Sequence, residues 1–268
     1  MKKRYKQSGR TLVEMTVVIT AIVLLGSFGL PAIRAFLDSF ESGTGARPVI
    51  SAAMASARAI AAKEQRYAGI RFQKAYHPDG PLAAPQYMVF IVQDPSIGAY
   101  FFRAVEGLQP IKLPDSLGVM DLKHRTNLNP RYSGDDPIDT DVEISDLNIL
   151  RDTTAFSIIF SPSGKLVIHN VRVRNRDGEG DSPSFPDLSR DDIFNKSAKV
   201  NAGIAMFYQD DYANLGLGQE ESRRGFIIYD RLKFKRAYQQ GQAYSGYLWK
   251  LIPDAIYINP YTGTMIEK

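Results

Sequence analysis

The chain lacks cysteine altogether, and it holds only three histidines among its 268 residues. The missing cysteine excludes a disulfide scaffold, a cysteine-ligated zinc site, an iron–sulfur cluster and a thiol nucleophile. The histidines (His77, His124 and His169) show no close metal-ligand spacing, and no phosphate-binding loop or nucleophile-elbow motif is present. We therefore expect that the chain is not an enzyme and has no resident cofactor.

Most of the chain also has no excess of positive or of negative charge. The formal net charge is +4, but four basic residues (Lys2, Lys3, Arg4 and Lys6) lie in the first nine positions. The rest of the chain has 29 basic and 29 acidic residues, so bulk charge does not indicate a general nucleic-acid-binding surface. A hydrophobic fraction of 44% excludes a disordered chain.

A long uncharged run follows the basic start. Residues 15–33 carry no charge and consist mainly of Val, Ile, Leu, Ala and Thr. As a helix they would span roughly 28 Å, close to the thickness of the bilayer hydrocarbon. No small-residue cleavage site of the secretory type follows, so a cleaved signal peptide is disfavoured. The positive flank predicts a cytoplasmic N-terminus.

Glu14 lies at the edge of this apolar run, where a carboxylate is costly unless it is paired. It follows Gly9-Arg10-Thr11-Leu12-Val13, and the whole stretch 8–19 resembles the cleavage signal of type IV prepilins and type II secretion pseudopilins. A plain membrane anchor, the main alternative, would not need a glycine and a glutamate at these offsets.

The resemblance assigns a role to four residues. It implies that a prepilin peptidase cuts between Gly9 and Arg10 and N-methylates Arg10, although the family usually has Phe at that position. Glu14 would neutralise the terminal ammonium of a neighbouring subunit during filament assembly, and Pro31 would bend the helix. Further implied partners are other pseudopilins or pilins and the inner-membrane assembly platform. The implied location is the inner membrane, with the rest of the chain in the periplasm.

The remaining chain divides into a second helical stretch and a β-rich part. We expect an α+β fold in which a long N-terminal transmembrane helix precedes an antiparallel β-sheet or β-sandwich head, as in pilins. The expected boundaries are a leader (1–9), an N-terminal helix (10–68, with 12–37 in the membrane, a break near 42–47 and a second segment at 48–67) and a head (69–268). Long loops are expected near 106–150 and 174–200. Seven runs have strand character: 70–72, 87–92, 100–105, 155–160, 165–173, 226–229 and 255–258.

Two weaker motifs narrow the resemblance. The stretch 52–72 is similar to the helix-to-strand segment of the GspH/FimT group of minor pseudopilins, and the turn at 161–164 is similar to that group's central hairpin. The sequence therefore suggests a minor pseudopilin of a type II secretion filament. The alternatives are a FimT-type minor pilin that binds DNA for uptake and a pilus-tip priming subunit.

Two candidate ligand sites remain. Asp177, Glu179 and Asp181 alternate with glycines and could wrap a calcium ion, although a solvated acidic loop is the favoured interpretation. DNA contacts under the alternative reading would come from two basic strings, of which the first would share one face of a strand. These strings are Arg172, Arg174 and Arg176, and Lys233, Lys235 and Arg236.

Overall fold

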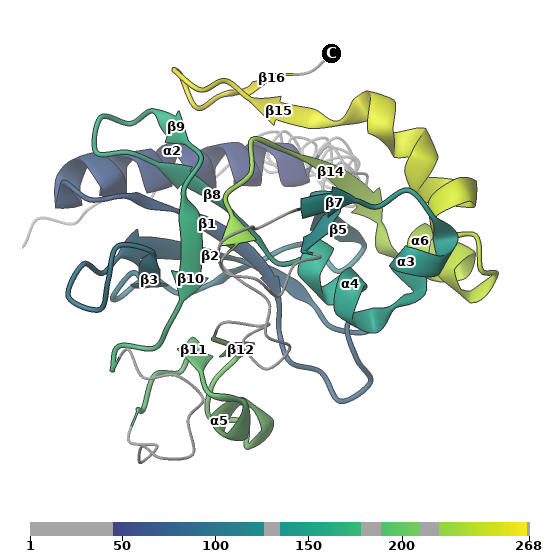
Figure 1. The fold of residues 1–268 in the computed structure, drawn as a ribbon, viewed down its shortest axis with the longest axis horizontal. Coiled ribbons are helices and arrows are strands. Elements are labelled where there is room, and N and C mark those ends of the chain that lie inside the picture. Colours follow the sequence, from purple (N-terminus) through teal and green to yellow (C-terminus); the bar gives the residue numbers. More distant parts are fainter. Residues whose placement is uncertain (1–44, 126–134, 178–188, 210–219, 267–268) are drawn as a thin grey trace, which may run out of the picture. The chain divides into compact units, whose positions relative to one another are not determined.

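The computed structural model describes residues 45–125, 135–177, 189–209 and 220–266, and Figure 1 shows their arrangement. Residues from Ala46 onward form one unit, which we call the head. It contains one long helix, a large curled sheet, smaller sheets and a group of short helices. The helices are α2 (Ala46–Glu64), α3 (Asp141–Ser145), α4 (Leu147–Thr153), α5 (Ser197–Asn201), α6 (Arg231–Gln239), η2 (Ala243–Tyr247) and η3 (Leu248–Asp254).

The main sheet has the strand order β13-β10-β3-β2-β1-β8-β9, with β4 pairing to β2. Its strands are β1 (Ala68–Lys74), β2 (Gln86–Gln93), β3 (Phe101–Ala104), β4 (Ile111–Lys112), β8 (Phe156–Phe160), β9 (Leu166–Val167), β10 (Asn170–Val173) and β13 (Glu220–Glu221). Consecutive strands β9 and β10 pair at opposite ends of this order, yet only Ile168 and His169 separate them. The sheet must therefore curl like half a barrel, so that its two ends approach each other.

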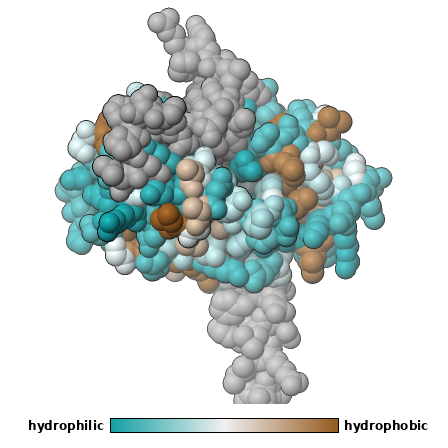
Figure 2. Space-filling view, turned by 90° about the horizontal axis from the view of Figure 1, so that it is seen from below, coloured by the Kyte–Doolittle hydropathy of each residue, from teal (hydrophilic) through white to brown (hydrophobic). Residues whose placement is uncertain are grey.

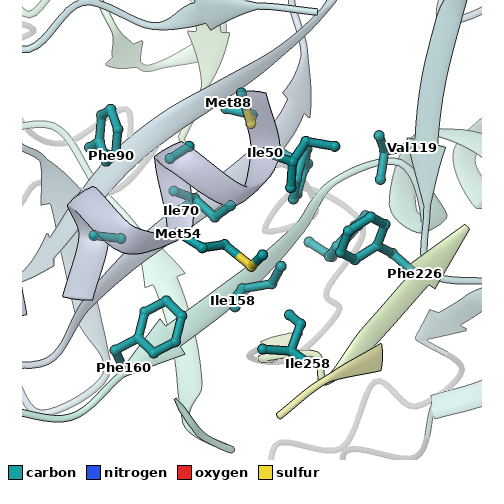
Figure 3. Close-up of a cluster of buried hydrophobic side chains, with 14 of the residues drawn as sticks. Ile50, Met54, Ile70, Met88, Phe90, Val119, Ile158, Phe160, Phe226 and Ile258 are labelled. Carbon is teal, nitrogen blue, oxygen red and sulfur yellow. The ribbon is translucent and has the colours of Figure 1, made fainter. Parts of the chain in front are cut away.

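Helix α2 covers the face of the sheet that lies outside this curl. Its buried residues recur at helical spacing, and most of them are alanines, which let the helix approach the strands closely. Figure 3 shows Ile50 and Met54 of α2 among Ile70, Ile158 and Phe160 of the sheet. Pro48 is tolerated because it lies in the first turn, where its missing N–H is not needed.

A second sheet completes this core. It has the order β16-β15-β14-β5 and consists of β5 (Leu117–Met120), β14 (Gly225–Asp230), β15 (Ile256–Ile258) and β16 (Met265–Ile266). Gln86 joins the two sheets: its side-chain amide donates to Val119 O at 2.8 Å and accepts from Val119 N at 2.7 Å. A buried glutamine thus takes the place of a strand's backbone groups. The opposite face of the second sheet packs on α3, α4, α6, η2 and η3 around Phe234 and Leu248.

The inner face of the curled sheet has a core of its own. Val89, Ile91, Phe102 and Ile159 point to this side and pack against Phe194 and Phe207. The last two residues belong to a short parallel pair, β11 (Phe194–Asn195) and β12 (Phe207–Tyr208). Because both faces are covered, the central strands β1, β2 and β8 are buried along almost their whole length.

The expected fold class is wrong in two respects. The described residues form an α+β unit of mostly β structure that contains no long apolar helix, and none of its helices could cross a membrane. The head is also neither a sandwich nor purely antiparallel, because β10 runs parallel to β3 and the main sheet curls around an inner core. The apolar run 15–33 lies outside the described residues.

Some of the local predictions are confirmed and one is wrong. Each of the seven predicted runs contains a strand, although 165–173 holds two short ones. The predicted hairpin turn is confirmed: Gly164 N donates to Ser161 O at 2.8 Å, and Gly164 has the positive φ of 75° that favours glycine. The expected long loop at 106–150 is wrong, because it contains β4, β5, β6 (Lys123–Arg125), β7 (Asp135–Pro137), α3 and most of α4.

Candidate functional site

The predicted processing and assembly residues (Gly9, Arg10, Glu14 and Pro31) lie outside the described residues, as do Glu179 and Asp181 of the predicted calcium loop. Asp177 is described and exposed. Within the described ranges, no group of three or more His, Asp or Glu side chains is arranged to hold a metal ion.

The three arginines of the first basic string do not share an exposed sheet face, because strand β10 ends at Val173. Arg172 lies within the strand and is half-buried. Arg174 is 9% exposed and its guanidinium lies 5.4 Å from the centre of the Phe101 ring. Arg176 pairs with Glu106 at 3.1 Å and with Asp191 at 3.2 Å. The charges of Arg174 and Arg176 are therefore engaged within the head.

The second basic string lies on α6. Asp230 caps this helix by accepting from Lys233 N at 2.9 Å, and Phe234 anchors it in the core. Lys233, Lys235 and Arg236 are exposed. The structure thus places these three residues on the surface of one nine-residue helix. The two acidic residues that pair with Arg176 are not part of this helix.

The described residues form a groove of about 460 Å³. It lies between the β6–β7 ribbon, the segment that joins β13 to β14, and the C-terminal η3–β15 segment. Ile168, Ile252 and Tyr257 line it and are each more than a third exposed. The exposed charged residues Lys123, Asp139 and Arg224 line it as well. Tyr244 also lines it and contacts Trp249 edge-on, with ring centroids 6.2 Å apart.

The floor of the groove is an ion cluster that the sequence did not reveal. Arg223 pairs with both Asp121 and Asp135, and all three side chains are at least nine-tenths buried. Nearby, Arg125 pairs with Asp152 at 2.7 Å and also donates its backbone N–H to that carboxylate. These pairs fasten the β6–β7 ribbon to the head through charge and not through apolar packing. They were missed because the partners are 27–102 residues apart.

A second buried ion pair lies inside the curl. Arg71, in the middle of β1, pairs with Glu220 of the edge strand β13, and it also donates to Ser157 Oγ at 3.1 Å. Gln73 donates to Tyr208 O at 2.9 Å. This cluster ties four strands together across the inner face.

The buried charges on the floor of the groove neutralise one another. Burial raises the pKa of Asp121 to about 6, against the opposing attraction of Arg223. The two carboxylates in turn raise the pKa of Arg223. Each of these charges is held by another, so the described floor has no carboxylate positioned as a free general base. The surface that remains for contact combines exposed apolar side chains with the exposed charges of Lys123, Asp139 and Arg224.

Figure 2 shows another face of the molecule, on which hydrophilic residues predominate and hydrophobic ones form small separate patches. Comparisons with protein-family models, with curated proteins and with solved structures find no match to this chain.

Proposed function

We propose that the chain is a minor pseudopilin of a type II secretion or related type IV filament, processed by a prepilin peptidase and assembled through its N-terminal segment. The observation that carries the proposal is the spacing of Gly9, Arg10 and Glu14 ahead of the apolar run 15–33. A carboxylate at that edge needs a cationic partner, and a neighbouring subunit's new N-terminal ammonium would supply one.

The head adds two supporting features. Its first element, α2, follows the N-terminal segment in the sequence, and it packs on the sheet through one face only. The other face carries small exposed side chains at Ala52, Ala55, Ser56 and Ala59, which would let a neighbouring subunit approach closely. On this proposal the protein begins in the inner membrane with its head in the periplasm.

Processing is tested by an intact-mass measurement of the full chain taken from its native membrane. We expect a chain that begins at Arg10 and carries an N-methyl group, and we expect Gly9→Val to retain Met1 entirely, because the peptidase requires a small residue before the cut. Gly26→Val, which changes a glycine away from the cut, is the matched control and should be processed normally. A mature terminus at Arg10 in Gly9→Val would refute the site.

Assembly is tested by Glu14→Ala. Removing one partner of an apolar ion pair costs about 3–5 kcal/mol, so incorporation into filaments should fall more than about a hundredfold while processing stays intact. Immunoblotting of sheared filaments measures this. Glu41→Ala, beyond the apolar run, is the matched control and should assemble normally. Equal incorporation of the Glu14→Ala chain would mean that the carboxylate has no role in assembly.

A further inference from the structure

A small pocket of about 50 Å³ lies where β1 ends, away from the groove. Lys74 from the end of β1, His77 from the following turn, Arg151 from α4 and Tyr208 from β12 line it, together with Tyr76. Every one of these side chains can donate a hydrogen bond, and no carboxylate is among the lining residues. Four separate parts of the chain thus come together at one place.

The ammonium of Lys74 has no counterion among the described residues. Its Nζ donates to Pro81 O at 2.7 Å and, more weakly, to Ala84 O at 3.5 Å. A second cation, Arg231, shares the acceptor Ala84 O with Lys74: it donates to the carbonyls of Ala83 and Ala84 at 3.0 and 2.8 Å. Burial, and then the charge of Arg231, lower the pKa of Lys74 to about 7.

Arg151 is the other full charge at the pocket, and no described carboxylate pairs with it. His77 is 35% exposed on its side chain, and Asp79 beside it is 80% exposed and does not line the pocket. The hydroxyl of Tyr208 donates its only proton to Asn201 Oδ1 at 2.7 Å, so Tyr208 forms part of the pocket wall and is not a donor to the anion. An enclosed ammonium without a counterion is unfavourable, and a bound anion would remove that cost.

We propose that this pocket binds a compact oxyanion, such as a sulfate or phosphate group, with Lys74 and Arg151 as its charged donors and His77, Tyr76 and Tyr208 around them. The inference is independent of the proposed filament function, because it rests only on residues of the head.

The proposal predicts that the affinity of the pocket for an anion depends on pH. The anion requires a charged Lys74, and the amine of the free protein loses its proton above about pH 7. Between pH 7.5 and 9 the affinity for sulfate, whose own charge is constant, should therefore fall by nearly tenfold per pH unit. The groups that face Lys74 are Arg151, Arg231, His77, Tyr76 and Tyr208.

The test is calorimetric titration of the full chain with sulfate at constant ionic strength, with chloride as the reference anion. Arg151→Met should weaken sulfate binding about tenfold or more. Lys74→Met should weaken it as strongly and remove the pH dependence. Lys112→Met is the matched control, since Lys112 is an exposed lysine paired with Asp115, and it should bind sulfate as the unchanged protein does.

Two further measurements keep the test decisive. If Lys74→Met does not fold, labelling of Lys74 in the unchanged protein with an amine-reactive reagent should be slowed by sulfate but not by chloride. Inorganic phosphate and glycerol phosphate, titrated in parallel, distinguish a free ion from a phosphate group on an organic molecule. Sulfate binding that is undetectable, or that is the same in Arg151→Met and in the unchanged protein, overturns the proposal.

Discussion

Replacing Arg223 by methionine should destabilise the head by about 3–5 kcal/mol, because it leaves two buried carboxylates without their partner. Asp121 and Asp135 are 2% and 7% exposed, and both pair with this one guanidinium. Urea unfolding of the full chain in a mild detergent, at pH 7.5, would measure the change. The same measurement on Arg224→Met provides the control, since Arg224 is the neighbouring residue but is exposed, and it should change by less than about 0.5 kcal/mol.

The loss of stability caused by Arg223→Met should also depend on pH. Because burial already raises the pKa of Asp121 to about 6, its charge is a cost to folding that grows as the pH rises from about 4 to above 6. Without Arg223 that pKa rises further, so the carboxyl is neutral at pH 5 and the variant recovers part of the lost stability there. A loss that is equal at pH 5 and pH 7.5 would mean that unpaired Asp121 is not its source.

Gly69→Ala should be the second most damaging change, at about 3 kcal/mol or more. Gly69 lies in β1 between β2 and β8, and a Cβ there would lie 2.0 Å from Ile158 O and 2.8 Å from a methyl of Ile159. Backbone at the centre of a covered sheet cannot move aside cheaply. Thermal unfolding and urea unfolding of the full chain would both show the loss.

Gly80→Ala separates crowding from backbone strain. Gly80 has a φ of 82° but no atom within 4 Å of an added Cβ, so only the left-handed conformation is penalised, at about 1 kcal/mol. We expect the loss at Gly69 to be clearly the larger of the two. Equal losses would show that β1 and β8 can separate enough to admit a methyl group.

Local structure could be predicted where a short stretch of sequence is sufficient to determine it. The strands could be recognised from their β-branched and aromatic residues, and the hairpin turn could be recognised from Ser161-Pro162-Ser163-Gly164. The second helical stretch was expected at 48–67, and α2 covers Ala46–Glu64. The elements hidden in 106–150 were missed because strands of two to four residues carry too little periodicity to detect.

The sites within the head could not be predicted in the same way. A strand such as β1 appeared half-exposed in sequence, since Arg71 and Gln73 alternate with Ile70 and Phe72. Only the curl of the sheet covers the second face, and only then does Arg71 meet Glu220, which lies 149 residues away. The groove rim and the donor pocket have the same origin, because each gathers side chains from distant elements.

By itself, then, the sequence determined the neutral balance of charge beyond the first nine residues, the absence of thiol chemistry and the offsets of Gly9 and Glu14 on which the proposed function rests. These depend on composition and on neighbours along the chain. The tertiary structure alone decided that the sheet curls, that Arg223 and Arg71 become buried ion-pair partners, and that Lys74 donates to backbone carbonyls in a pocket whose lining contains no carboxylate. Such features depend on which strands pair at long range, and that choice is made by the packing of the whole core.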